Sequence, residues 1–346
     1  MPESSPFPKS EILIVGAGVL GLCTAVELTR RGHAVTVLDP GGANASSVAA
    51  GMIAPALEAA IDDATPERGA LLRAARVLWT GFAQATGVSL KPGPAVWRGE
   101  GGDEIAARLS ALGFAVERLG EDVLTTDDVQ VEPEAAMARL IAGLRMPPLV
   151  GAALSVSRED GRWRVVTDAG VLEADKVVLA TGAAKALPGL PGTVARLMGA
   201  VTPIRGQIGR TDVALADGVV RGQGAYLAPA GSGGLIGATM EPGRTDLAPD
   251  PEAGRVLLEA ASRVMGRDLT GIAADWRVGV RGTTPDGLPM AGATGEPGLF
   301  LALAPRRNGW LLGPLVGQAV ADGIEGRAMA DHAGALDPRR FLSPSR

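Results

Sequence analysis

The stretch that decides the fold is Glu11-Ile-Leu-Ile-Val-Gly-Ala-Gly-Val-Leu-Gly-Leu-Cys-Thr-Ala-Val-Glu27. Residues 12–15 are consecutive apolar residues, which predict a buried strand. Residues 19–31 have helical spacing with one apolar face, which predicts a helix. The glycines between and within these elements follow the G-x-G-x-x-G spacing, so the order of strand, turn and helix is typical of a dinucleotide-binding site.

Each glycine of the turn has a steric reason. Gly16 permits the tight turn, Gly18 lets a pyrophosphate approach the backbone, and Gly21 lets helix and strand pack closely. The helix N-terminus then offers N–H groups to the phosphates. A second predicted strand, residues 34–38, ends at Asp39, near the spacing at which an acid binds ribose hydroxyls. The alternative is a glycine-rich turn that only packs.

Composition sets limits on function. The chain has 346 residues, enough for two lobes, and a net charge of -5. It has no basic tract, so we expect no nucleic-acid partner, and its apolar runs are too short to span a membrane. Cys23 is the only cysteine, and the N-terminus lacks the pattern of a signal peptide. We therefore expect a cytoplasmic protein.

The rest of the chain predicts alternating helices and strands. Residues 40–55 form a small-residue loop without a clear period, and residues 149–179 form a meander of three or four strands. The last of these strands runs into Thr181-Gly182. Helices are predicted at residues 64–86, 103–112, 132–144, 251–265 and 310–324.

Four blocks occur together and in order. They are the opening glycine stretch, the strand ending Ala180-Thr-Gly182, Arg281-Gly-Thr-Thr-Pro-Asp-Gly-Leu-Pro289, and Arg307-Asn-Gly309. The chain resembles the FAD-dependent amino acid oxidases of the D-amino acid oxidase superfamily, and within it the glycine oxidases of thiamine biosynthesis. Supporting segments lie at residues 47–55, 205–207, 226–229 and 237–241.

The resemblance implies an α/β fold (α+β overall), in which a Rossmann-like FAD-binding domain accompanies a mostly antiparallel β-sheet substrate domain. The FAD-binding domain is expected to be discontinuous, and the ends of the chain are expected to be tails. The expected bounds are 10–60, 130–199 and 275–330 for the FAD domain, 61–129 and 200–274 for the substrate domain, and 1–9 and 331–346 for the tails.

The resemblance also implies a reaction. Glycine or a small amino acid would be oxidatively deaminated by hydride transfer to flavin N5, with imine hydrolysis and reoxidation by O2 giving H2O2. A D-amino acid or N-methyl amino acid (sarcosine-type) oxidase, or a dehydrogenase with another electron acceptor, is the alternative. A flavin protein without turnover and an NAD-dependent dehydrogenase are more distant alternatives. The substrate, the acceptor and the oligomeric state, including a homo-oligomer, stay open.

Oxidation of an amino acid requires an anchored carboxylate and stabilised negative charge on the flavin. Arg281 matches the family's carboxylate-binding arginine, and an arginine fork suits that task. Tyr226, the only tyrosine, matches a substrate-site tyrosine, and Arg307 matches a second arginine near flavin and substrate. Met52 would lie beside the isoalloxazine. The alternatives are a structural salt bridge, a packed aromatic ring and a core methionine.

The resemblance places a larger set of residues around FAD. Some relatives attach the flavin through a C-terminal cysteine, but Cys23 is in the first helix, so we expect non-covalent FAD. With only His33 and His332 as histidines, we expect no metal site and no general base, which fits hydride transfer from a neutral amine. The expected cofactor residues are Gly16, Gly18, Val19, Gly21, Asp39, Ser46, Ser47, Ala50, Gly51, Met52, Leu154, Thr181, Gly182, Arg306, Arg307, Asn308, Gly309, Trp310 and Leu311.

Two positions depart from the family pattern. Gly282 stands where proline often follows the carboxylate-binding arginine. The block that commonly reads Gly-His-Phe-Arg-Asn-Gly is Ala304-Pro-Arg-Arg-Asn-Gly309 here, so Pro305 replaces a histidine on the flavin side. We expect these changes to alter substrate range, oxygen reactivity or flavin potential.

Overall fold

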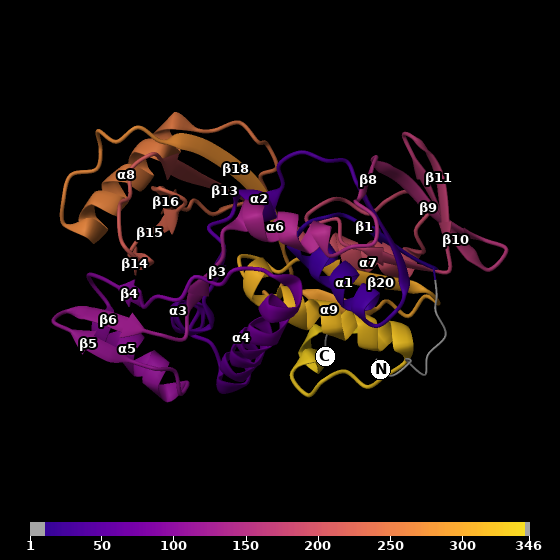
Figure 1. The fold of residues 1–346 in the computed structure, drawn as a ribbon, viewed down its shortest axis with the longest axis horizontal. Coiled ribbons are helices and arrows are strands. Elements are labelled where there is room, and N and C mark those ends of the chain that lie inside the picture. Colours follow the sequence, from indigo (N-terminus) through magenta and orange to yellow (C-terminus); the bar gives the residue numbers. More distant parts are fainter. Residues whose placement is uncertain (1–10, 343–346) are drawn as a thin grey trace. The chain divides into compact units, whose positions relative to one another are not determined.

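The computed structural model describes residues 11–342, so the predicted tail at residues 1–9 lies outside the described residues. Its internal contacts divide the chain into two units (Figure 1). The first unit comprises residues up to 43, 137–203 and from 281 onward, and the second comprises residues 44–136 and 204–280. Residues 44–60, which the resemblance assigned to the FAD domain, belong to the second unit.

The first unit is built on a mostly parallel sheet. The strand order is β19-β20-β12-β1-β2-β8, and only the edge strand β19 runs antiparallel to its neighbour. The central strands read as continuous apolar runs because both faces of a parallel sheet are covered. The strands are β1 (Glu11–Val15), β2 (Ala34–Asp39), β8 (Leu149–Val150), β12 (Lys176–Leu179), β19 (Met290–Ala293) and β20 (Leu299–Leu303).

Helices α1 (Val19–Arg30) and α9 (Gly309–Glu325) pack against each other in the first unit. Glycine allows this approach, because a Cβ at Gly313 would lie 2.8 Å from the sulfur of Cys23 and one at Gly317 would lie 2.9 Å from its carbonyl oxygen. Cys23 is therefore fully buried, and burial raises the pKa of its thiol. A third helix, α7 (Gly192–Gly199), contributes Val194, Leu197 and Met198 to the core of this unit.

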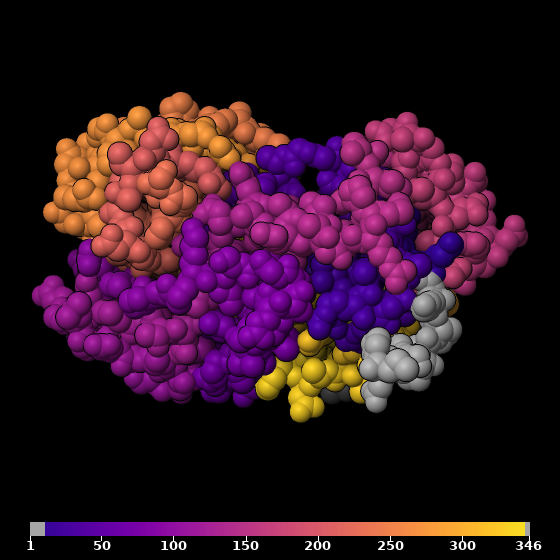
Figure 2. All heavy atoms as spheres, in the orientation of Figure 1, coloured from indigo at the N-terminus to yellow at the C-terminus, as the bar shows by residue number. Residues whose placement is uncertain are grey.

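The meander predicted at residues 149–179 is smaller than expected. Three strands, β9 (Ala153–Glu159), β10 (Arg162–Thr167) and β11 (Gly170–Ala174), form an antiparallel sheet of their own. β8 and β12 instead join the parallel sheet. The reason is burial: residues 177–179 are fully buried, whereas β10 alternates between buried and partly exposed residues. The outer part of this meander lies at the surface of the first unit (Figure 2).

The second unit contains a mostly antiparallel sheet in the order β17-β13-β16-β15-β14-β4-β6-β5, with β18 paired to β13. The first two residues of β13 and the last three of β18 belong to the first unit. Along this order of strands from β17 to β5, the pair β14–β4 is parallel and the other neighbouring pairs are antiparallel. The strands are β4 (Ala95–Trp97), β5 (Glu117–Leu119), β6 (Asp122–Thr125), β13 (Thr202–Thr211), β14 (Val220–Gly222), β15 (Ala225–Ala230), β16 (Gly233–Gly237), β17 (Glu241–Pro242) and β18 (Asp275–Thr283). Together with the first unit, this arrangement confirms the predicted fold class.

Helix α8 (Pro251–Met265) covers β14, β15 and β16 (Figure 1). It has the predicted bounds because its end signals are strong. The Asp250 side chain accepts hydrogen bonds from two first-turn N–H groups, and Gly266 ends the helix in the left-handed region. The second unit also contains the longer helices α3 (Pro55–Ile61), α4 (Pro66–Thr86) and α5 (Gly102–Ala111), and α6 (Pro133–Ala142) links the two units in the chain.

Residues 40–55 are not the loop that the sequence predicted. They contain α2 (Ala45–Val48) and β3 (Met52–Ile53), which pairs with β7 (Val129–Gln130), and they reach the start of α3. Elements of two to four residues carry no periodic signal. The expected C-terminal tail also differs, because η1 (Ala333–Leu336) and η2 (Pro338–Phe341) are 3-10 helices in contact with β19.

Candidate functional site

The β1–α1 turn tolerates no side chain at two of its glycines. Gly16 has a φ of 113°, and a Cβ there would lie 2.3 Å from the carbonyl oxygen of Ala180. A Cβ at Gly21 would lie 2.0 Å from the carbonyl oxygen of Gly16. The turn is therefore closed against the end of β12, as the steric argument from the sequence requires.

The N-terminus of α1 suits an anionic ligand. Gly18 is the N-cap and supplies no side-chain oxygen to the first-turn N–H groups, and the first turn contains no acidic residue. The Asp39 carboxylate accepts hydrogen bonds from the N–H groups of Ala17 (2.7 Å) and Gly41 (2.8 Å). These bonds hold the predicted ribose-binding acid beside the glycine turn.

The end of β12 contributes a buried polar atom without a partner. The hydroxyl oxygen of Thr181 is buried and makes no hydrogen bond. Gly182 follows it in the left-handed region at a φ of 65°. A buried unsatisfied hydroxyl destabilises a protein unless something binds it. Together with the glycine cradle, Thr181 shows that the residues present fit the dinucleotide part of FAD.

Two backbone segments that carry three arginines meet in the first unit at the start of α9. Arg281 lies near the end of β18, and its neighbour Gly282 accepts a 2.8 Å hydrogen bond from the N–H of Arg306. A Cβ at Gly282 would lie 3.1 Å from the Gly182 oxygen, so the strand also packs against the end of β12. Arg307 follows Arg306 directly. The segment that carries the predicted carboxylate-binding arginine is therefore hydrogen-bonded to the segment that carries the predicted flavin-side arginines.

The turn before α9 has an unusual backbone. Ala304 and Arg306 are both left-handed, at φ values of 60° and 54°. Such a conformation costs a non-glycine residue about 1–2 kcal/mol and often occurs at functional sites. Pro305 between them pairs with Thr283 and accepts the N–H of Asn308 at 2.9 Å. Pro305 is therefore part of the hydrogen-bonded turn that precedes α9.

The N-termini of α1 and α9 are neighbours in the first unit. Asn308 is the N-cap of α9 and makes no side-chain cap, and a Cβ at Gly309 would lie 3.2 Å from the Val19 side chain. Trp310 and Leu311 are buried in the first turn. The partial positive charge of both helix ends therefore adds to the charge of the arginines.

The second unit carries the other predicted residues except Leu154. Gly51 has a φ of 71°, and a Cβ there would lie 2.1 Å from the oxygen of Val131, so only glycine fits. Ser47 and Asn44 form a capping box at the start of α2, in which the Ser47 hydroxyl accepts the N–H of Asn44. The Asn44 side-chain oxygen accepts the N–H groups of Ser46 and Ser47. Ala50 is buried, and its carbonyl accepts a side-chain hydrogen bond.

The ring of Tyr226 lies across Gly237 of the neighbouring strand β16. A Cβ at Gly237 would lie 2.3 Å from the Tyr226 hydroxyl oxygen, so this glycine makes room for the ring. Leu154, an expected cofactor residue, lies on β9 with 51% of its surface exposed. The roles of Tyr226 and Leu154 remain predictions.

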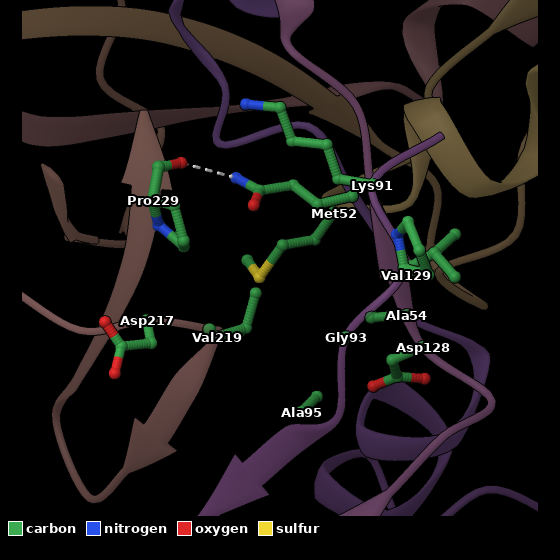
Figure 3. Close-up of a pocket in the computed structure, with 13 residues that line it drawn as sticks. Met52, Ala54, Lys91, Gly93, Ala95, Asp128, Val129, Asp217, Val219 and Pro229 are labelled. Carbon is green, nitrogen blue, oxygen red and sulfur yellow. Dashed lines mark hydrogen bonds between the residues drawn. The ribbon is translucent and has the colours of Figure 1, made fainter. Parts of the chain in front are cut away.

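Met52 lines a pocket of about 220 Å³ that lies wholly within the second unit (Figure 3). Asp128, which the sequence analysis missed, also lines it and accepts hydrogen bonds from the N–H groups of Ala56 (2.8 Å) and Leu57 (3.3 Å). Burial raises the pKa of the Asp128 carboxyl to about 7. No periodic pattern marks this acid, because it follows a turn and precedes a strand of two residues.

Two features are absent from residues 11–342. No helix there is long and apolar enough to cross a bilayer. No group of three or more His, Cys, Asp or Glu side chains in that range could hold a metal ion.

Comparison with known proteins identifies the family. The model of the family DAO, described as FAD dependent oxidoreductase, matches residues 11–323. The crystal structure of glycine oxidase from Geobacillus kaustophilus superposes with a TM-score of 0.80 at 26% identity, covering 96% of this chain and 99% of that chain.

Two curated relatives are each 30% identical to this chain. Glycine oxidase from Geobacillus kaustophilus (strain HTA426) matches over 93% of this chain and 94% of its own length. The tRNA 5-methylaminomethyl-2-thiouridine biosynthesis bifunctional protein MnmC from Caulobacter sp. (strain K31) matches over 92% of this chain and 55% of its own length. The chain thus spans about half the length of the bifunctional relatives that it matches. The chain belongs to the family of FAD-dependent oxidoreductases that includes the glycine oxidases.

Proposed function

We propose that this protein oxidises the α-amine of glycine or another small amino acid, using non-covalently bound FAD and releasing H2O2 when O2 is the electron acceptor. The observation that carries the proposal is the backbone hydrogen bond between Gly282 and Arg306, which brings the segment of Arg281 next to that of Arg306 and Arg307 at the start of α9. We propose that these arginines form the cationic site that binds the substrate carboxylate. The relative named glycine oxidase supports the choice of substrate.

In the proposed reaction, the first unit binds the cofactor. The glycine turn and the N-terminus of α1 hold the pyrophosphate, Asp39 binds the ribose, and the Thr181 hydroxyl gains the hydrogen-bond partner that it lacks. When bound, FAD supplies the two-electron acceptor that amine oxidation requires. The start of α9 stabilises the negative charge that develops during the reaction.

The side chains around the substrate orient it. Arg281 and Arg307 bind the carboxylate, which fixes Cα relative to the cofactor. We propose that the Tyr226 hydroxyl donates a further hydrogen bond to that carboxylate. We propose that the Met52 side chain contacts the amine end. Both roles follow from the family resemblance.

A second candidate substrate is a secondary amine. The relative whose name includes 5-methylaminomethyl-2-thiouridine biosynthesis matches as well as the glycine oxidase does, and that name describes a secondary amine. An N-methyl amino acid or a D-amino acid, oxidised with O2 or with another acceptor, is therefore the alternative. A cytoplasmic role in thiamine biosynthesis is a narrower proposal, and it rests on the family resemblance of the sequence.

Steady-state kinetics test the proposal. We would measure kcat/KM for glycine, sarcosine and D-alanine, once with O2 and peroxide detection and once with a dye acceptor under nitrogen. The proposal predicts the highest value for glycine with O2. A dye-only reaction would make the protein a dehydrogenase, and a marked preference for sarcosine would favour the secondary amine.

A further inference from the structure

The C-terminal segment, residues 331–342, is fixed to the first unit, although the sequence predicted a tail. The side chains of Ala333 and Leu336 are buried, and Phe341 packs against the core of this unit. Both 3-10 helices of the segment contact β19, and η1 also contacts α9. The match to the family model ends at residue 323, so that match gives the C-terminal segment no role.

One side chain of this segment, Arg340, reaches the loop that connects β18 to β19, residues 284–289. Its Nε lies 2.8 Å and its Nη2 3.2 Å from the two carboxylate oxygens of Asp286. Nη2 also lies 2.9 Å from the carbonyl oxygen of Leu288 and 3.1 Å from that of Pro289. An arginine fork that binds a carboxylate at two points fixes its orientation as well as its distance. Arg340 therefore attaches the β18–β19 loop to the C-terminal segment.

The β18–β19 loop is organised around the same carboxylate. Asp286 accepts a hydrogen bond from the N–H of Leu288 at 3.0 Å, and the Thr284 hydroxyl lies 2.8 Å from it. Burial alone would raise the pKa of the Asp286 carboxyl, but the hydrogen bonds from Arg340 and Leu288 hold that pKa below its ordinary value. The carboxylate is therefore charged at neutral pH and remains a partner for Arg340.

The loop begins where the two arginine-bearing segments meet. Thr283, the last residue of β18, pairs with Pro305. Next to it, Gly282 accepts the N–H of Arg306 at 2.8 Å. The turn that holds Arg306 contains left-handed non-glycine residues, a conformation that persists only when the surrounding structure fixes it. Since Arg281 lies in the last part of β18, an attached loop restricts the backbone of that arginine as well.

We propose that Arg340 is a positioning residue for the substrate carboxylate, because its contact with the β18–β19 loop holds the segment of Arg281 in the arrangement that binds a carboxylate. The inference rests on the proposed function, which assigns the carboxylate to Arg281 and Arg307. When a ligand binds only one arrangement of a loop, its apparent affinity falls with the fraction of protein in that arrangement. Loss of the Arg340 contact should therefore weaken carboxylate binding.

Cofactor binding should not change with it. The hydrogen bonds of Arg340 to the described residues end in the β18–β19 loop and at the Asp337 carbonyl of its own segment. The glycine turn before α1 is built from other contacts, which involve Gly16, Gly21 and the end of β12. Carboxylate affinity and FAD affinity are thus separate readouts, and a residue that only supports the fold would alter both.

Ligand titrations test the proposal. We would measure the Kd of sodium acetate, a simple carboxylate, for the FAD-loaded protein at constant ionic strength from the visible flavin spectrum, and the Kd of FAD for the FAD-free protein. Arg340→Ala should raise the Kd of acetate by about five- to tenfold, because charge-assisted hydrogen bonds of a partly exposed pair are lost. The Kd of FAD should stay the same. With glycine, KM should rise by a similar factor and kcat should stay the same.

Three controls separate positioning from support of the fold. Arg339→Ala is the matched control, because that neighbouring arginine pairs with Asp337 within the segment, and it should leave the Kd of acetate unchanged. Arg340→Lys keeps the charge but loses the two-point fork, so its Kd for acetate should lie between those of the unmodified protein and Arg340→Ala. Millimolar guanidinium chloride, compared with sodium chloride, should restore acetate affinity to Arg340→Ala and leave the unmodified protein unchanged.

The outcomes separate this inference from the proposed function. A Kd of acetate that rises in Arg340→Ala and falls again with guanidinium supports the positioning role. An unchanged Kd in Arg340→Ala overturns that role and leaves the proposed function intact. A loss of acetate affinity that guanidinium does not reverse, that FAD affinity shares or that Arg339→Ala shares also overturns it. An unmodified, FAD-loaded protein that binds no acetate and is not reduced by glycine, sarcosine or D-alanine overturns both proposals.

Discussion

Replacing Asp128 by asparagine should remove a pH dependence of stability. The Asp128 side chain is buried at 3% exposure. Burial raises the pKa of its carboxyl from 3.8 to about 7, although two N–H groups and the charge of Arg221 act in the opposite direction. The folded protein therefore binds this proton more tightly than the unfolded chain does.

The sign and size of the effect follow from that difference. Because folding raises the pKa of Asp128, the bound proton stabilises the native state. This stabilisation is complete at pH values below the unfolded pKa of about 3.9, and it is lost as pH rises through the folded pKa of about 7. Three pKa units correspond to about 4 kcal/mol in total. Between pH 5 and pH 8 the expected loss is about 2.5 kcal/mol, because part of it is already lost at pH 5.

The assay is urea unfolding followed by circular dichroism at pH 5, 6, 7 and 8. Asp128→Asn keeps one acceptor oxygen but cannot ionise, so its stability relative to the unmodified protein should rise by about 2.5 kcal/mol from pH 5 to pH 8. Asp217→Asn is the control, since that carboxylate is exposed at the same pocket, and it should leave the pH profile unchanged. A constant difference between Asp128→Asn and the unmodified protein would refute the reasoning.

Three further predictions concern the cofactor and the substrate. Arg281→Ala should raise the Kd of a carboxylate ligand, read from the flavin spectrum, by at least about tenfold because a charge-assisted hydrogen bond is lost, while FAD affinity stays the same. Thr181→Val should weaken FAD binding by about tenfold in a titration, yet leave the stability of the FAD-free protein unchanged or raised, because the hydroxyl has no partner there. Acid precipitation should leave the yellow colour in the supernatant, and a yellow pellet would contradict non-covalent binding.

Local chemistry explains which elements could be predicted from the sequence. The glycine turn was predictable because each glycine has a steric reason, and the structure shows those contacts at Gly16 and Gly21. Helix α8 was predictable to its end residues because Asp250 and Gly266 are strong caps. The family resemblance added the predicted roles of the blocks around Arg281 and Arg307, which no periodicity reveals.

Other features depend on contacts between distant residues. β12 was predicted as part of a meander, but its place between β1 and β20 is decided by burial on both faces. β3 and β7 have two residues each and stabilise each other by pairing, so neither has a local signal. The pocket beside Met52 and the burial of Asp128 depend on that pairing, which is why the sequence analysis missed them.

The central claim is tested most directly by mixing the FAD-loaded protein with glycine in the absence of oxygen and recording the visible flavin band. The account predicts that the band bleaches and that it returns when air is admitted, with one H2O2 formed for each flavin reoxidised. A band that persists with glycine, sarcosine and D-alanine would contradict the account, because the arginines at the start of α9 would then bind no oxidisable amino acid.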